Sequence, residues 1–323
     1  MHFTKKGRCG VLFCLWLALA GSACAQAWPA RPVRVIVAFS PGGVTDIIAR
    51  TTAPKLAELW GQPVVVENRT GAGGSVGAMA VARAPADGYT LLVHSSGYAL
   101  NTAINSSLPY DPRKDFVEVA PLASQPMVLV VGASGPASVA ELLAAARQHP
   151  GQLSYGSAGI GSGAHFNSEK FRIAAGIEVL HVPYKGGAEA IQDTIAGRIG
   201  FTFNTVTLAL PHIREGRLRV LAVSSAQRSG LLPGTPTVAE SGIPGFEYTF
   251  WNGLWAPAGT PPAVVQKISR DLARTVTSPE VRERLAALGA EPMSMAPEEF
   301  ARFVHAEIED AARIARAAGI RLQ

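Results

Sequence analysis

One stretch, residues 33–49, constrains the fold more than any other part of the chain. It starts with an apolar run that predicts a buried strand, and it continues through Gly42 and Gly43 into a helical pattern expected to begin near Thr45. The first amides of such a helix have no intrahelical acceptors and lie at the positive end of the helix dipole. Since the two glycines carry no Cβ, a small anion can approach these amides closely. The stretch therefore predicts an α/β fold and one half of an anion site.

The same residues also fit a simpler interpretation, a tight strand-to-helix connection that binds nothing. In that case Thr45 is the N-cap of the helix, and Asp46 is favourable in its first turn. The motif alone does not separate the two interpretations, so other parts of the chain have to decide between them.

The N-terminus has the order of a secretory signal peptide. Three basic residues precede an apolar run over residues 9–20, and the small residues 23–25 form the expected cleavage box. We therefore expect export, with residues 1–25 removed as a signal peptide. Two alternatives keep the chain at the membrane, a lipid anchor on Cys24 or an uncleaved segment, although the apolar run is short for a membrane span.

Composition excludes several classes of function once the signal is removed. All three cysteines, Cys9, Cys14 and Cys24, precede the proposed cut, so the mature chain has no disulfide, catalytic thiolate or cysteine-bound metal. Three of the 29 Lys and Arg residues also precede it, which leaves 26 basic against 24 acidic residues, a net charge of +2. This small charge predicts no nucleic-acid partner. No later apolar run approaches the length of a membrane span, so we expect a soluble mature protein.

A second α/β unit repeats the arrangement of the first. A capping box at residues 138–141 opens a helix, a strand is expected at residues 153–155, and a loop rich in Gly and Ser over residues 156–165 leads into another helix. Two such helix starts on separate units can converge on one anion from opposite sides of a cleft.

This second loop also matches a nucleotide-binding pattern. Gly159-x-Gly161-x-x-Ala164 fits the dinucleotide fingerprint, and Glu178 lies near the spacing expected for a ribose contact. An exported protein is not expected to meet a nucleotide pool, so we favour simple anion binding at this loop.

Two segments are predicted to cross between the units. The first is the interrupted apolar stretch at residues 119–131, and the second is the aromatic-rich stretch at residues 246–255. Three helices follow, and the periodicity of their apolar residues predicts that they pack against the first unit without a site of their own.

No pattern typical of an enzyme is complete. None of the seven histidines belongs to an HExxH motif, and no serine has the glycines of a nucleophile elbow. We therefore expect no enzyme activity, no catalytic residue, no metal and no cofactor. The alternative is an exported enzyme, either a nucleotide-using oxidoreductase or a hydrolase built on Ser96 or Ser162.

Several motifs, spread in order over nearly the whole mature chain, resemble one known family. They are Trp28-Pro-x-Arg-Pro, Pro41-Gly-Gly-x-x-Asp46, Gly61-Gln-Pro-Val-Val-Val-Glu-Asn-Arg69 with Gly71-Ala-Gly-Gly74, Asp87-Gly-Tyr-Thr-Leu91, Leu108-Pro-Tyr-Asp-Pro112, His181-Val-Pro-Tyr-Lys-Gly186 and Pro236-Thr-Val-Ala-Glu240. The chain is thereby similar to the Bug-type (TctC-like) periplasmic solute-binding receptors of the tripartite tricarboxylate transporter family.

The resemblance implies a two-lobed periplasmic-binding-protein architecture of type II, a Venus flytrap with hinge strands. Residues 26–125 would form lobe 1, residues 126–250 lobe 2, and residues 251–323 the hinge return with C-terminal helices on lobe 1. The cleft between the lobes would hold a small organic acid, largely through backbone amides and bridging waters.

Site residues follow from the matching motifs. Lobe 1 would contact the ligand through Phe39, Pro41, Gly42, Gly43, Asp46, Ser95, Ser96 and Gly97. Lobe 2 would contact it through Ser157, Ala158, Gly159, Gly161, Ser162, His165, Tyr184 and Asn204. The chain departs from the family pattern at Phe203-Asn204, where Asp-Asn is frequent, and at Ser40, where proline is frequent. Both departures bear on which ligand is bound, and not on the fold.

The function implied is that of an extracytoplasmic receptor for a small carboxylate in the periplasm. Its partners would be the ligand and the membrane permease subunits of a tripartite tricarboxylate transporter, and we expect a monomer. An alternative with the same fold is a periplasmic ligand sensor for a signalling partner.

Overall fold

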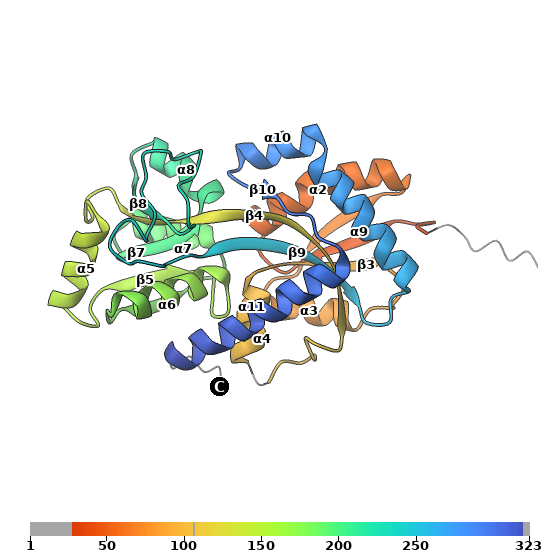
Figure 1. The fold of residues 1–323 in the computed structure, drawn as a ribbon, viewed down its shortest axis with the longest axis horizontal. Coiled ribbons are helices and arrows are strands. Elements are labelled where there is room, and N and C mark those ends of the chain that lie inside the picture. The colour runs from red at the N-terminus through yellow and green to blue at the C-terminus, as the bar shows by residue number, and fades with distance from the viewer. Residues whose placement is uncertain (1–27, 106, 319–323) are drawn as a thin grey trace, which may run out of the picture.

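A computed structural model describes residues 28–105 and 107–318 (Figure 1). The strands are β1 (Val33–Val37), β2 (Val64–Asn68), β3 (Thr90–Ser95), β4 (Phe116–Gly132), β5 (Ser154–Ser157), β6 (Leu180–Pro183), β7 (Phe201–Thr205), β8 (Leu218–Val223), β9 (Thr249–Pro257) and β10 (Glu291–Pro292). The helices are α2 (Val44–Trp60), α3 (Ser75–Ala82), α4 (Gly97–Ile104), α5 (Val139–Gln148), α6 (Gly163–Ala175), α7 (Gly187–Ile195), α8 (Val206–Arg214), α9 (Pro262–Thr277), α10 (Pro279–Ala287) and α11 (Pro297–Ala318), with a 3₁₀ turn, η2 (Ala72–Gly74), before α3.

Strand β4 joins the two halves of the molecule. Its residues 116–126 pair with β9, whereas residues 127–132 pair with β7 and β8. The strands therefore follow one continuous order, β2-β1-β3-β9-β4-β7-β5-β6, and β8 and β10 also pair with β4. In Figure 1, β4 and β9 run side by side through the middle of the molecule. The prediction that residues 119–131 cross between the units is confirmed, and the second predicted segment forms β9.

We call the half with β1 to β3 and α2 to α4 lobe 1, and the half with β5 to β8 and α5 to α8 lobe 2 (Figure 1). The α/β fold and its two-lobed architecture agree with the sequence-based expectation. The lobe boundaries at residues 125 and 250 stay a prediction. The predicted signal peptide, residues 1–25, lies outside the described residues.

In lobe 1, β1 lies between β2 and β3, and all three run parallel. Helix α2 contacts these strands, and α9 contacts α2. At the end of α2 the buried Trp60 donates its Nε1–H to Oδ2 of Asp271 on α9, over 2.9 Å. This buried hydrogen bond ties the C-terminal part of the chain to lobe 1.

Lobe 2 has a parallel core of its own, with β5 between β6 and β7. The buried rings of Phe171 on α6 and Phe203 on β7 pack edge to face, with their centroids 5.4 Å apart. Two α/β cores on one shared strand leave the loops at the carboxyl ends of the strands facing the space between the lobes.

Local signals predicted some helix ends well and others poorly. Ser138 caps α5 as expected, since its Oγ accepts the N–H of Glu141 over 3.1 Å. The interpretation of Thr45 as an N-cap is wrong, because α2 starts at Val44 and its N-cap is Gly43. Helix α4 was not predicted, since it starts at a glycine without a side-chain cap and the preceding residues continue the pattern of a strand.

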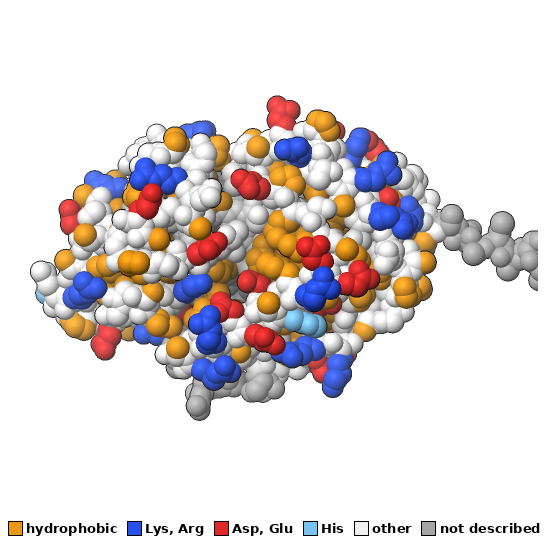
Figure 2. Space-filling model, viewed as in Figure 1, with side chains coloured by type: hydrophobic (Ala, Val, Ile, Leu, Met, Phe, Trp, Pro, Cys, Tyr) orange, Lys and Arg blue, Asp and Glu red, His pale blue; other side chains and the backbone are white. Residues whose placement is uncertain are grey.

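No helix in the described part of the chain combines the length and the apolar character needed to cross a membrane. Figure 2 shows basic and acidic side chains interspersed over the visible face, without a continuous field of one sign. This distribution fits the small net charge derived from the sequence.

The contact between α11 and β9 leads to a stability prediction. A Cβ added to Gly253 on β9 would lie 2.3 Å from Cζ of Phe300 and 2.9 Å from Trp255, and both rings are fully buried. Gly253→Ala should therefore lower the free energy of unfolding by roughly 1–3 kcal/mol, the usual cost of overpacking. Urea unfolding measures this change. Gly230→Ala, at a position with open space and an ordinary backbone, is the matched control and should leave the stability within about 0.5 kcal/mol of the wild type.

Candidate functional site

The two lobes and the crossing strands enclose a small cavity, which we call the inner chamber. Its volume is about 60 Å³. Lobe 1 contributes the loop after β1, lobe 2 contributes the starts of three helices, and β4 and β9 contribute Met127 and Phe250. The lining residues are Phe39, Ser40, Gly43, Val44, Thr45, Ser95, Met127, Ala158, Ser162, Gly163, Ala164, Gly186, Gly187, Asn204, Thr205, Leu208 and Phe250.

Four helices begin at the wall of the inner chamber. Their N-cap residues are Gly43 for α2, Ser162 for α6, Gly186 for α7 and Thr205 for α8, and all four line the chamber. Each helix start leaves amides without intrahelical acceptors and carries a partial positive charge. No Asp, Glu, Lys, Arg or His lines the chamber in the described chain, so the helix starts set its electrostatic field. This arrangement suits a small anion held by backbone amides.

Two polar side chains at the chamber, Asn204 and Ser162, hold helix starts. Nδ2 of Asn204 donates to the carbonyl oxygen of Gly187 over 2.8 Å, and its Oδ1 accepts the N–H of Thr205 over 3.0 Å. Oγ of Ser162 accepts the N–H of His165 over 3.2 Å. By contrast, the buried Oγ1 of Thr205 has no hydrogen-bond partner among the described residues. Thr205 is therefore a buried side chain at the wall whose hydroxyl is left for a ligand.

Asp46 stabilises the loop between β1 and α2 through its hydrogen bonds. Its carboxylate accepts hydrogen bonds from the N–H of Gly42, from Nε of Arg50 and from Nδ2 of Asn68, all within 2.9 Å. Burial alone would raise the pKa of Asp46, but these hydrogen bonds together outweigh it and hold the pKa below its usual range. Asp46 does not line the inner chamber, so its predicted contact with the ligand stays a prediction.

The lobes meet backbone to backbone, with glycines at the contact. A Cβ added to Gly73 would lie 2.5 Å from the carbonyl oxygen of Ile160. A Cβ added to Gly97 would lie 2.7 Å from the carbonyl oxygen of Gly161 and 3.1 Å from the amide nitrogen of Gly163. Since these contacts join lobe 1 to lobe 2 without space for a side chain, the structure is a closed form.

In the described part of the chain, neither serine of the hydrolase alternative is hydrogen-bonded to a histidine ring or to a carboxylate. The hydroxyl of Ser96 shares a hydrogen bond of 2.7 Å with the hydroxyl of Tyr248, and Ser162 caps α6. Burial raises the pKa of the Tyr248 hydroxyl, which keeps it protonated at neutral pH. Ser96 therefore links α4 to the segment that precedes β9 and has a structural role.

A stack of rings supports the second loop. His165 lies 4.2 Å from His181 between ring centroids, and His181 lies 4.9 Å from Tyr155. Nδ1 of His165 accepts the N–H of Gly161 over 3.3 Å, and Nε2 of His181 lies 2.6 Å from Oγ of Ser157. Burial lowers the pKa of His165 to about 4 and that of His181 to about 3. Both rings are therefore neutral at physiological pH, and His165 acts as an acceptor for its own loop.

A second cavity, which we call the outer chamber, adjoins the inner one and shares Phe39 and Ala158 with it. Its volume is about 570 Å³, and its walls include the loop at residues 70–74 and Lys185. Tyr184 also lines it, with its hydroxyl donating to Oδ2 of Asp193 over 2.7 Å.

The predicted site residues divide into three groups. Those at the inner chamber are Phe39, Gly43, Ser95, Ala158, Ser162 and Asn204. Gly159 and Tyr184 line the outer chamber instead. Those that line neither are Pro41, Gly42, Asp46, Ser96, Gly97, Ser157, Gly161 and His165.

The sequence reasoning missed a further group at the inner chamber. These residues are Ser40, Val44, Thr45, Met127, Gly163, Ala164, Gly186, Gly187, Thr205, Leu208 and Phe250. A signal existed for Thr205, because the alternating residues 199–203 just before it have the pattern of a strand. None existed for Met127, Leu208 and Phe250, whose apolar side chains look like ordinary core residues.

The dinucleotide pattern of the second loop does not assemble into a nucleotide site. Ser154 pairs with Leu180 and Ser157 with Pro183 in the parallel ladder of β5 and β6. The glycine loop follows the carboxyl end of β5, whereas Glu178 precedes β6 and lies at the opposite end of the ladder. In a dinucleotide site the loop and the acidic residue share the carboxyl edge of the sheet.

Comparisons with known proteins agree on one family. A family model described as the tripartite tricarboxylate transporter family receptor matches residues 48–320. The BugT protein of Bordetella pertussis is 38% identical over 315 residues, which cover 96% of this chain and 97% of that one.

Two solved structures from Rhodopseudomonas palustris are similar over almost their whole length. The first, a complex with adipate, has a TM-score of 0.87 and 38% identity and covers 91% of this chain and 99% of its own. The second, MatC with bound malate, has a TM-score of 0.84 and 33% identity and covers 89% of this chain and 99% of its own.

The glycine contact between the lobes leads to a prediction about closure. Gly97→Ala should leave the separated lobes unaffected and prevent their full approach, because its Cβ meets only the backbone of lobe 2 closely. Small-angle X-ray scattering should then show a larger radius of gyration than for the wild type under conditions that close it. Gly234→Ala, with open space around its Cβ, is the control and should scatter like the wild type. A compact Gly97→Ala variant would contradict this prediction.

The buried histidines predict a pH dependence of stability. Burial lowers the pKa of His165 to about 4 in the folded chain, whereas its ordinary pKa, which holds in the unfolded chain, is about 6.5. As the pH falls below about 6.5, the unfolded chain therefore binds a proton that the folded chain does not bind. Stability is thus fully present above pH 6.5 and is lost on acidification, by about 2 kcal/mol between pH 7 and pH 5 for this group. His165→Gln should reduce this loss in urea unfolding. His149→Gln, the same exchange at an exposed position, is the control variant for the substitution itself.

Proposed function

Because the chain belongs to the tripartite tricarboxylate transporter receptor family, we propose that it is a periplasmic solute receptor that closes on a small carboxylate. We further propose that it delivers this ligand, as a monomer, to the membrane permease subunits of a tripartite tricarboxylate transporter. Receptors of this family bind solutes, and two similar structures hold adipate and malate, which supports a carboxylate as the class of ligand.

The observation that carries the proposal is the convergence of four helix starts on one chamber without a charged side chain. A carboxylate has two oxygens that accept several hydrogen bonds, and amides fixed at helix starts can donate them without a reorganisation cost. The absence of Lys and Arg from the chamber wall of the described chain also allows release, since no strong ion pair has to be broken.

Closure follows from the placement of these donors on both lobes. Val44 and Thr45 belong to lobe 1, whereas Ser162, Gly187 and Thr205 belong to lobe 2. A ligand that contacts both sides binds the closed form more tightly than the open one, so it shifts the hinge equilibrium toward closure. Residues 126 and 127 of β4, where its pairing passes from β9 to β7, are where we expect the hinge to bend.

The test is thermal unfolding of the mature protein with a panel of mono-, di- and tricarboxylates, amino acids and NAD. A ligand at a hundred times its dissociation constant stabilises the folded state by about 2.7 kcal/mol, which raises the midpoint by several degrees. We expect a shift with one class of carboxylate and no turnover of that compound. A shift with NAD alone, or turnover of the bound acid, would contradict the proposal.

A substitution at the chamber wall sharpens this test. Gly43→Val should abolish the ligand-induced shift of the unfolding midpoint, because the valine side chain has to fit into the lining of the chamber. Even a Cβ at this position would lie 3.1 Å from the carbonyl oxygen of Ser40. Gly230→Val, in open space, should keep the shift and shows what an added valine does by itself. A full shift in Gly43→Val would place the ligand elsewhere.

A further inference from the structure

We propose that the ligand is a short monocarboxylate whose apolar body faces the hinge. This inference rests on the proposed function, since it specifies the acid that the same chamber takes. It departs from the two similar structures, whose ligands adipate and malate carry two carboxylates each.

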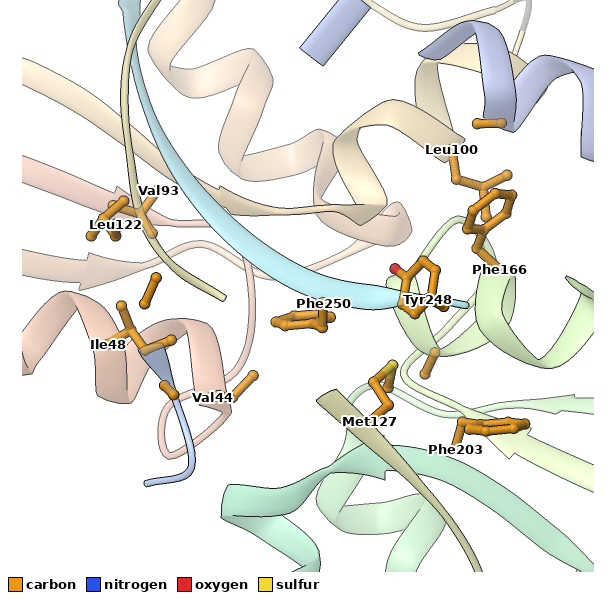
Figure 3. Packing of buried hydrophobic residues seen from close by; sticks show 14 of the residues in the cluster. Val44, Ile48, Val93, Leu100, Leu122, Met127, Phe166, Phe203, Tyr248 and Phe250 are labelled. Atoms are coloured by element: carbon orange, nitrogen blue, oxygen red, sulfur yellow. The ribbon is translucent and has the colours of Figure 1, made fainter. Parts of the chain in front are cut away.

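The residues that line the chamber divide into helix starts and loops on one side and apolar side chains on the other. The loops and helix starts supply amides, whereas the crossing strands supply Met127 of β4 and Phe250 of β9, and α8 supplies Leu208. In Figure 3, Val44 and Met127 lie on either side of Phe250, near the point where the lobes join. A carboxylate bound by the helix starts therefore directs the rest of its molecule at hydrocarbon side chains.

Among the described residues that line the chamber, a second carboxylate has no partner on that apolar side. Met127 is 2% exposed and Phe250 6% exposed, and neither side chain can donate a hydrogen bond. A charge pressed against them would lose its water without compensation, which is strongly unfavourable. An alkyl group in the same place gains from leaving water.

The size of the inner chamber limits the length of the ligand. A cavity needs about 10–15 Å³ of accessible volume to hold one water, and a water in the liquid takes about 30 Å³, so about 60 Å³ leaves room for only a few water positions. This is room for a carboxylate with a short chain. A longer acid has to extend past Phe39 and Ala158 into the outer chamber.

Thr205 provides a donor for the single carboxylate. Its Oγ1 is buried without a partner in the described part of the chain, at the start of α8, and Thr205 pairs with Met127 in the ladder of β7 and β4. The hydroxyl thus lies at the boundary between the polar and the apolar side. It fixes which end of the ligand faces the helix starts.

Calorimetric titration with matched pairs of acids tests the inference. Butyrate and succinate have the same chain length and differ in one carboxylate, and so do valerate and glutarate. We expect the monocarboxylate of each pair to bind at least tenfold more tightly than the dicarboxylate. A preference for the dicarboxylates overturns the inference and keeps the proposed function, whereas no binding of any carboxylate overturns both.

Two substitutions probe the opposite sides of the chamber. Leu208→Arg should reverse the preference, so that succinate binds more tightly than butyrate, because it brings a cation to the apolar side. Ile213→Arg on the same helix is the control. It should keep the preference for butyrate, since Ile213 does not line the chamber. Thr205→Val should weaken butyrate binding about five- to tenfold at an unchanged unfolding midpoint of the free protein. Unchanged selectivity in Leu208→Arg, or unchanged butyrate affinity in Thr205→Val, would overturn the assignment of that side.

Discussion

The hydrogen-bonded ladder between β4 and β9 is the interaction on which the rest of the structure depends. It extends from Phe116, paired with Pro257, to Pro126, paired with Thr249, and beyond it β4 continues into the sheet of lobe 2. Two α/β cores on one shared strand must present the loops at their strand ends to each other. The site is thus a consequence of topology, and the side chains of β4 and β9 become the wall of the chamber nearest the hinge.

Anion binding without a cation imposes a condition on the backbone. Amides on both lobes can reach one ligand only if the two backbones approach each other closely, which explains why glycines recur at the contact between the lobes. Gly97 and Gly163 show this most directly, since a Cβ on either would lie under 3 Å from atoms across the contact. Asp46 satisfies the same condition in another way, because it takes the N–H of Gly42 and fixes the loop from outside the chamber.

The sequence predicted the parts of the molecule that local patterns determine. The opening strand, its glycine turn and α2 follow from residues 33–49, and the capping box of α5 was confirmed in detail. Helix α4 could not be predicted, since it has no side-chain cap and the residues before it continue the pattern of a strand. The apolar wall could not be predicted either, since an apolar residue in a crossing strand has the same pattern whether it faces a core or a chamber. Phe250 is an example, because only the pairing of β9 with β4 determines what it faces.

The same geometry predicts that a closed form with a ligand is more favourable than an empty closed form. When the lobes approach, the positive ends of α2, α6, α7 and α8 come together at a chamber of about 60 Å³. Like charges in such a place repel more strongly than in water. With the lobes apart, water solvates each helix start. A carboxylate reverses the balance, since its charge attracts all four ends at once and supplies acceptors for their amides. On this argument, the repulsion between empty lobes and the attraction that closes them on a ligand come from the same helix starts.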